Sequence, residues 1–254
     1  MIHIHLTPSK EALGLAAAAR GADAIRDAIA KRGGANIVVA TGASQFEMLA
    51  ALVKADGIDW SRVTAFHLDE YIGMAPDHPA SFRRYLKERF TSLLPALGNF
   101  HFIEGDMPDL CAEMSRMNTL IARHPIDVTF AGIGENAHLA FNDPPADFDA
   151  KEPFRVVALD EKCRRQQFGE GWFPTFEDVP REAISMTVPQ IMKSALVILA
   201  VPDRRKAEAV RDVIEGPITP MVPASILRRH PSCHLFLDPQ SAALLRRVPE
   251  TAGE

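Results

Sequence analysis

The sequence predicts an α/β protein of the doubly wound class, in which helices sandwich a mainly parallel sheet in a Rossmann-like three-layer arrangement. Short apolar, β-branched runs alternate with helical stretches along almost all of the 254 residues. Runs that are apolar throughout indicate strands covered on both faces, as in a parallel sheet. No linker-like stretch divides the chain, so we expect a single domain over residues 1–254, with a lid segment inserted in it.

The elements of the first half follow from local signals. Residues 9–32 are expected to form a helix, because Ser9 is a suitable N-cap and Gly33-Gly34 would end it. NIVVAT and VTAFH are short, apolar and β-branched, as buried strands are. The expected strands are 36–41, 63–67 and 127–133, and the expected helices are 45–55, 82–90 and 109–123.

The second half continues the pattern but contains two long irregular segments. Strands are expected over 155–159, 183–187 and 195–201, all in the parallel sheet, and a helix over 204–215 before Gly216-Pro217. Residues 142–154 and 166–182 are rich in proline and glycine and are expected to be loops. Long loops are uncommon unless they are functional, so residues 160–182 are a candidate lid. A surface excursion anchored by Trp172 and Phe173 is an equal alternative.

Composition excludes several classes of protein. The 28 basic and 33 acidic residues give a net charge of −5, which argues against nucleic-acid binding. Cys111, Cys163 and Cys233 are too few and too scattered for a disulfide framework, and free thiols indicate a reducing compartment. Neither a signal peptide nor a membrane-spanning run is visible. We therefore expect a cytoplasmic protein without membrane partners, for which a homo-oligomer is possible.

Two strand ends offer places for an anion. In a parallel sheet, ligands bind at the carboxyl ends of the strands. The turn Thr41-Gly42-Ala43-Ser44 follows the strand at 36–41 and would present backbone N–H groups and hydroxyls to a phosphate. Lys206 lies at the equivalent place after the strand at 195–201. Each signal is weak alone, but together they favour a phosphorylated small molecule.

Two further strand ends carry groups for acid–base chemistry. Asp69 and Glu70 follow the strand at 63–67, where a buried carboxylate could serve as a general base, or could merely cap a neighbouring backbone. After 127–133, His138 lies between Asn136 and Asp143, which could fix its tautomer. No dedicated metal-ligand spacing and no GxSxG motif is present, so neither a metal centre nor a serine hydrolase is expected.

At these places the sequence resembles the glucosamine-6-phosphate deaminase (isomerase) family, whose fold is shared with 6-phosphogluconolactonases. The DEY-I-G…HP-x-S segment within 66–86 is the most specific match, and the likeness covers roughly residues 36–240. The matching segments are VVATGASQFEMLAAL (38–52), FHLDEYIGMAPDHPASFRRYL (66–86), IDVTFAGIGENAHLAFNDP (126–144) and KAEAVRDVIEGPITPMVPASILRRHP (206–231).

The resemblance implies an enzyme that converts an amino-sugar 6-phosphate and water to fructose 6-phosphate and ammonia, without a metal or organic cofactor. Asp69 would move a proton between the second and first carbons of the opened sugar. His138 would assist ring opening, and Asn136 and Asp143 would hold its imidazole. The phosphate would be bound by Thr41, Gly42, Ala43, Ser44 and Lys206.

Several positions depart from the family's pattern. Asn136 stands where many members carry Asp, Asp143 where they usually carry Glu, and Ala137 where Gly is typical. The segment 160–173 lacks the common arginine pattern, which leaves Arg164 or Arg165 as a second phosphate contact. The SSLxS-type residues linked to allosteric activation are absent. Glucosamine 6-phosphate is the first expected substrate, and the alternatives are a galactosamine-6-phosphate deaminase, a 6-phosphogluconolactonase-type hydrolase and a non-catalytic sugar-phosphate sensor.

Overall fold

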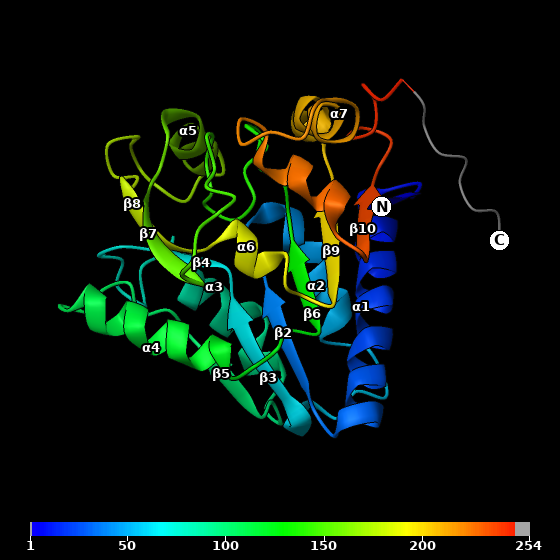
Figure 1. The fold of residues 1–254 in the computed structure, drawn as a ribbon, viewed down its shortest axis with the longest axis vertical. Helices are drawn as coiled ribbons and strands as arrows, with labels where there is room; N and C mark the ends of the chain where they lie inside the picture. Colours follow the sequence, from blue (N-terminus) through cyan, green and yellow to red (C-terminus); the bar gives the residue numbers. More distant parts are fainter. Residues whose placement is uncertain (1, 247–254) are drawn as a thin grey trace.

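A seven-stranded, wholly parallel sheet forms the centre of the protein (Figure 1). The computed structural model describes residues 2–246, and the strand order in the sheet is β1-β10-β9-β6-β2-β3-β5. The strands of this sheet are β1 (Ile2–Leu6), β2 (Ala35–Val39), β3 (Val63–His67), β5 (Asn99–His101), β6 (Val128–Ala131), β9 (Leu196–Val201) and β10 (Cys233–Leu237).

Helices cover both faces of this sheet, which confirms the predicted doubly wound α/β class. The helices are α1 (Lys10–Arg32), α2 (Phe46–Leu52), α3 (Phe82–Arg89), α4 (Leu110–Ala122), α5 (Glu161–Gly169), α6 (Val188–Ile191) and α7 (Ala207–Glu215). Short 3₁₀ turns lie at η1 (Ala43–Gln45), η2 (Trp60–Arg62), η3 (Thr91–Leu93), η4 (Arg204–Lys206) and η5 (Pro223–Arg229). Among the described residues, no helix is both long and apolar enough to cross a membrane.

Alternation along the strands divides the apolar residues between two cores. In β2, Ile37 and Val39 pack with α1, α2 and α3, whereas Val38 packs on the other face with α4, α6 and α7. Successive side chains of a strand point to opposite faces, so a continuous apolar run supplies both cores at once. This is the physical reason why the apolar runs at 36–41 and 63–67 predict central strands.

Helix α1 has the bounds that its end signals predict. The Ser9 side chain accepts a hydrogen bond from the N–H of Ala12 at 3.2 Å, and Gly33 ends the helix with φ of 80°. Gly21 lets this helix approach the sheet closely, because a Cβ there would collide with the ring of Phe130. The helix is thereby seated directly over β6 and β9.

A second, three-stranded antiparallel sheet corrects one part of the prediction. It consists of β4 (Asp69–Tyr71), β7 (Phe154–Ala158) and β8 (Glu182–Met186) in the order β4-β8-β7. The segments 155–159 and 183–187 are therefore strands, as expected, but they do not belong to the parallel sheet. β7 alternates between more and less buried residues, a pattern typical of a strand with one covered face.

The remaining differences between the expected and the observed elements concern short helices and strands and one helix in a segment that was expected to be a loop. The helix expected over 45–55 is limited to 46–52 after a 3₁₀ turn, and the strands β1, β4, β5 and β10 were not predicted. Part of the loop expected over 166–182 is helical, because α5 extends to Gly169. Asp160 starts that helix by accepting a hydrogen bond from the N–H of Cys163 at 2.6 Å. Residues 143–153 contain no helix or strand, as expected.

The change in chain direction at the centre of the sheet determines where a ligand can bind. β2 and β6 are neighbours, but the chain proceeds from β2 toward β3 on one side and from β6 toward β9 on the other. Such a switch point leaves a crevice beyond the carboxyl ends of the two strands. Helices α5 and α7 lie at that end of the molecule, toward which β2, β6 and β9 point in Figure 1.

Candidate active site

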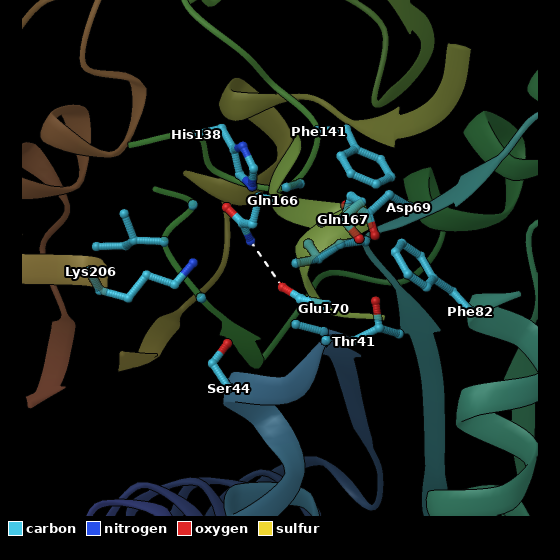
Figure 2. Close-up of a pocket in the computed structure, with 17 residues that line it drawn as sticks. Thr41, Ser44, Asp69, Phe82, His138, Phe141, Gln166, Gln167, Glu170 and Lys206 are labelled. Atoms are coloured by element: carbon cyan, nitrogen blue, oxygen red, sulfur yellow. Dashed lines mark hydrogen bonds between the residues drawn. The ribbon is translucent and has the colours of Figure 1, made fainter. Parts of the chain in front are cut away.

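A cavity of about 70 Å³, partly open to solvent, lies at this crevice. It is bounded by the turns after β2, β3, β6 and β9 and by helix α5. The lining residues are Ala40, Thr41, Gly42, Ser44, Leu68, Asp69, Phe82, Gly132, Ile133, Gly134, His138, Ala140, Phe141, Gln166, Gln167, Glu170 and Lys206 (Figure 2). Six of the nine residues predicted for the site therefore reach one cavity, and the other three, Ala43, Asn136 and Asp143, do not line it.

One end of the cavity is suited to an anion. Thr41, Gly42 and Ser44 line it from the turn after β2, and Gly42 adopts φ of 95°, a left-handed conformation that favours glycine. The Lys206 side chain enters from the turn after β9 and is 5% exposed. Burial lowers the pKa of Lys206, and its ammonium group has neither a hydrogen bond nor an ion pair among the described residues. A buried cation without a partner indicates a place for a negatively charged ligand.

Asp69 is the carboxyl group on the opposite side of the cavity. It lies on β4, and the rings of Phe82 and Phe141 line the cavity beside it (Figure 2). Burial, together with the neighbouring charge of Glu70, raises the pKa of Asp69 to about 8, and a hydrogen bond with the backbone of Phe141 partly opposes the rise. A carboxyl group that titrates near neutrality and faces a cavity has the properties of a general acid or base.

Glu70 points away from this cavity and caps helix α3. Its carboxylate accepts hydrogen bonds from the N–H groups of Tyr71 at 2.9 Å, Phe82 at 3.2 Å and Arg83 at 2.9 Å. The hydroxyl of Ser81 donates a further bond at 3.0 Å. The sequence of the LDEY segment was compatible with either a general base or a helix cap. Asp69 has the position expected of the base, and Glu70 is the cap.

His138 faces the cavity from the loop after β6. Its Nδ1 lies 3.1 Å from Oδ1 of Asp143, which leaves Nε2 for the cavity. The ring packs directly on Gly134, where any Cβ would collide with it. Ala137, in the same loop, adopts φ of 65°, a conformation that glycine adopts more easily. The loop thus holds the imidazole against a backbone without side-chain bulk.

Asn136 and Asp143 form the layer behind this imidazole. The Asn136 amide donates to Asp143 at 2.9 Å and to Asp160 at 3.0 Å, and its oxygen accepts from the N–H of His138 at 3.1 Å. Burial alone would raise the pKa of Asp143, but hydrogen bonds from His138 and Asn136 hold it below its usual value. Asp143 is therefore an ionised partner that orients the imidazole of His138 through Nδ1.

One group of side chains in the described part of the chain has the spacing of metal ligands. Nδ1 of His138, a carboxylate oxygen of Asp143 and Sγ of Cys163 lie within 4.8 Å of one another. Burial raises the pKa of the Cys163 thiol well above its ordinary value, as do the charges of Asp143 and Asp160. Metals bind the thiolate, so these residues fit a metal poorly in this arrangement. Cys163 nevertheless lies beside the site, although it was not among the residues predicted for the site.

Comparison with known proteins identifies the family. Residues 8–235 match the family described as glucosamine-6-phosphate isomerases/6-phosphogluconolactonase. The chain belongs to this family. A glucosamine-6-phosphate deaminase of Exiguobacterium sibiricum is 39% identical over 220 residues, which cover 87% of this chain and 85% of that protein. One from Lactobacillus delbrueckii subsp. bulgaricus is 34% identical over 84% of this chain and 89% of its own.

Solved structures of the family have the same fold. A monomeric glucosamine-6-phosphate deaminase superimposes with a TM-score of 0.85 at 29% identity, covering 95% of this chain and 99% of its own. A 6-phosphogluconolactonase from Leishmania guyanensis gives a TM-score of 0.78 at 15% identity, covering 97% and 100%. At that identity the lactonase supports the fold alone, whereas the deaminases also match in sequence.

The family resemblance did not reveal the contribution of helix α5. Gln166, Gln167 and Glu170 line the cavity from this helix and its end. Neither arginine of the segment reaches the cavity. Arg164 is buried and donates to the carbonyl of Val179 at 2.9 Å, and Arg165 pairs with Glu161 at the surface. Residues 166, 167 and 170 have the spacing that places three polar side chains on one face of a helix. This pattern was overlooked because the segment was expected to be a loop.

Proposed function

We propose that this family member is a glucosamine-6-phosphate deaminase, which converts glucosamine 6-phosphate and water to fructose 6-phosphate and ammonia. The observation that carries the proposal is the arrangement of three groups around one cavity. A carboxyl group that titrates near neutrality faces the space, a paired imidazole lies across from it, and a buried lysine lies at an anion-binding end. The relatives that are 34–39% identical over most of the chain carry this name.

Each group has a role in this reaction. Nε2 of His138 would exchange a proton with the ring oxygen as the pyranose opens, while Asp143 stabilises the charge on the imidazole. Asp69 in its ionised form would remove the proton from the second carbon and return it to the first. The positive ammonium group of the substrate favours the ionised form of Asp69, because opposite charges attract strongly in a desolvated site. Lys206 and the turn at Thr41–Ser44 would bind the phosphate.

The departures from the family's pattern are compatible with these roles. Asn136 keeps the geometry of His138 by accepting from its backbone N–H and by donating to Asp143. Asp143 reaches Nδ1 at 3.1 Å although its side chain is one methylene shorter than Glu. The carboxylate of Asp143 therefore stays in contact with the imidazole, which is enough to orient it.

The lid interpretation of residues 160–182 gains support from the side chains that this segment contributes to the cavity. Gln166 and Gln167 of helix α5, and Glu170 directly after it, form one side of the cavity. We therefore infer that this segment moves to admit the sugar, as a lid does. The expected cytoplasmic location stays a prediction.

The test is an assay of the purified protein with glucosamine 6-phosphate. Ammonia and fructose 6-phosphate should appear in equal amounts, and Asp69→Asn should abolish both products while the binding of inorganic phosphate persists. Galactosamine 6-phosphate and 6-phosphogluconolactone are the comparison substrates. Lactone hydrolysis without release of ammonia would overturn the proposal in favour of the hydrolase. Binding of the amino-sugar phosphates without any turnover would favour the sensor.

A further inference from the structure

The anion end of the cavity contains a negative side chain. Glu170 follows helix α5 and lines the cavity together with Gly42, Ser44 and Lys206 (Figure 2). Its Oε2 lies 3.8 Å from the position that a Cβ on Gly42 would occupy, so the carboxylate approaches the turn that is suited to a phosphate. A carboxylate is an unexpected neighbour for an anion, because like charges repel in a site with little water.

The position of Glu170 is defined by its own segment. Oε1 accepts a hydrogen bond from the side-chain amide of Gln166 at 3.2 Å, and Oε2 accepts one from the indole of Trp172 at 3.3 Å. Neither contact neutralises the charge, since both donors are uncharged. No arginine or lysine lies within ion-pair distance of this carboxylate among residues 2–246. Its negative charge therefore acts on whatever occupies the cavity.

Lys206 is the cation on which Glu170 acts. Burial lowers the pKa of Lys206, and among the charges that oppose this effect Glu170 is the strongest, ahead of Glu135. One buried lysine beside one carboxylate amounts to a net charge near zero, without an excess positive charge to hold a dianion. A phosphate that carries a proton has a single negative charge and also offers an O–H group to a carboxylate acceptor.

We propose that Glu170 is a specificity-determining residue that selects the singly charged, protonated form of the phosphate group over the dianion. The P–OH group of the ligand donates a hydrogen bond to Glu170, and the remaining oxygens face Lys206 and the turn at Thr41–Ser44. No bond to phosphorus forms or breaks, and the proton comes from the phosphate's own acid–base equilibrium, whose pKa is about 6. This inference rests on the proposed binding of a sugar phosphate and deepens it.

Other titratable or charged groups act on the same region. Arg205 pairs with Glu135 at 3.6 Å beside Lys206. The phenol of Tyr85, which donates to the carbonyl of Gly42 at 3.1 Å, lies on the side of helix α3. The groups whose charge or ionisation bears on the anion end from the surrounding elements are Glu47, Asp69, Tyr71, Tyr85, Arg89, Glu135, Asp203, Arg205 and Lys206. Because Glu170 itself raises the pKa of Lys206, a change in the ionisation of Lys206 forms part of the difference between the wild type and Glu170→Gln.

The experiment measures the dissociation constant of inorganic phosphate by calorimetry for the wild type, Glu170→Gln and Glu161→Gln, at pH 5.5 and pH 8. Glu161 lies on the same helix but is exposed and pairs with Arg165, so it is the matched control. At pH 8, where phosphate is mainly a dianion, Glu170→Gln should bind it about tenfold more tightly than the wild type. At pH 5.5 this gain should shrink to less than threefold. Glu161→Gln should bind like the wild type at both pH values.

Several outcomes would overturn the proposal. They are an equal gain at both pH values, weaker binding by Glu170→Gln at pH 8, the same change in Glu161→Gln, and no binding of phosphate by wild type and Glu170→Gln alike. The result does not depend on turnover. If the protein releases no ammonia but phosphate binding responds as described, the proposed reaction fails and the role of Glu170 stands. If ammonia is released but the ratio of the two phosphate dissociation constants is independent of pH, the proposed reaction stands and the role of Glu170 fails.

Discussion

Asp69 and Glu70 are adjacent carboxyl groups on one short strand, and they face opposite sides of it. Both are buried, with exposed fractions of 7% and 0%. Glu70 receives three backbone N–H groups and a hydroxyl, whereas Asp69 faces the cavity between two aromatic rings. Burial raises the pKa of both, but only for Glu70 do several hydrogen bonds oppose the rise. The supply of hydrogen-bond donors, rather than burial, therefore separates a capping carboxylate from one whose pKa lies near neutrality.

The largest expected effect is the loss of turnover in Asp69→Asn. An amide is similar in size to the carboxyl group but cannot take up a proton from carbon, so release of ammonia should fall by about 10³-fold or more. The measurement is the rate of ammonia production at a saturating concentration of glucosamine 6-phosphate. A change in KM alone, with the maximal rate preserved, would mean that Asp69 only positions the substrate.

Glu70→Gln also replaces a carboxylate by an amide, but it should lower the stability of the protein. The carboxylate offers two acceptor oxygens to donors on both sides, and an amide can offer only one oxygen. Whichever way the amide turns, its NH₂ group faces N–H donors that lose their partner. The free energy of unfolding should fall by about 3 kcal/mol, because buried donors without partners are costly. Urea denaturation at pH 7 measures it, and a loss below 0.5 kcal/mol would contradict the capping role.

Asp69→Asn, in contrast to Glu70→Gln, should raise the free energy of unfolding, and it should do so only at higher pH. The folded state holds the Asp69 proton up to about pH 8, whereas the unfolded chain releases it near pH 4. The wild type therefore binds more protons when folded, and its stability decreases as pH rises from about 4 to 8. The amide removes this decrease, so the variant should be more stable by about 2 kcal/mol at pH 8, less than the full shift because a buried amide also costs free energy.

The measurement is the free energy of unfolding of both proteins at pH 4.5 and pH 8. The wild type should lose stability relative to the variant as pH rises, and at pH 4.5 the variant should be the less stable of the two, because its buried amide costs free energy at every pH. Parallel pH dependence would show that the Asp69 pKa is not raised in the folded state. Glu70→Gln, measured in the same series, separates the general effect of losing a negative charge from the effect of this site.

The comparison also shows how far sequence reasoning extends. The central strands were predicted because each short apolar run supplies both cores, and β3 has the predicted bounds. The small sheet was not predicted, because β4 has only three residues and a single residue separates it from β3. Its pairing with β8 joins residues more than a hundred positions apart. Local signals carry no information about such pairing, so two correctly predicted strands were assigned to the wrong sheet.

The candidate site was predictable to the extent that it follows strand ends. Thr41, Asp69, His138 and Lys206 all follow strands of the parallel sheet or lie one or two turns beyond them, and all reach the cavity. Glu170 was missed because it directly follows helix α5, in a segment that was expected to be a loop far from the strand ends in sequence. Whether Asp69 or Glu70 faces the cavity also could not be read from the sequence. That choice depends on the register of β4 against β8 and on the position of helix α3.

The smallest expected effect comes from removing one of the donors to Glu70, the hydroxyl of Ser81. Ser81 donates to Glu70 at 3.0 Å and also caps helix α3 by accepting from the N–H of Arg84 at 3.3 Å. In Ser81→Ala the carboxylate keeps its three backbone donors, so the free energy of unfolding should fall by only about 1 kcal/mol. Ser92→Ala, which removes an exposed hydroxyl, is the control and should cost less. If Ser81→Ala cost as much as Glu70→Gln, the hydroxyl rather than the backbone donors would stabilise the buried charge.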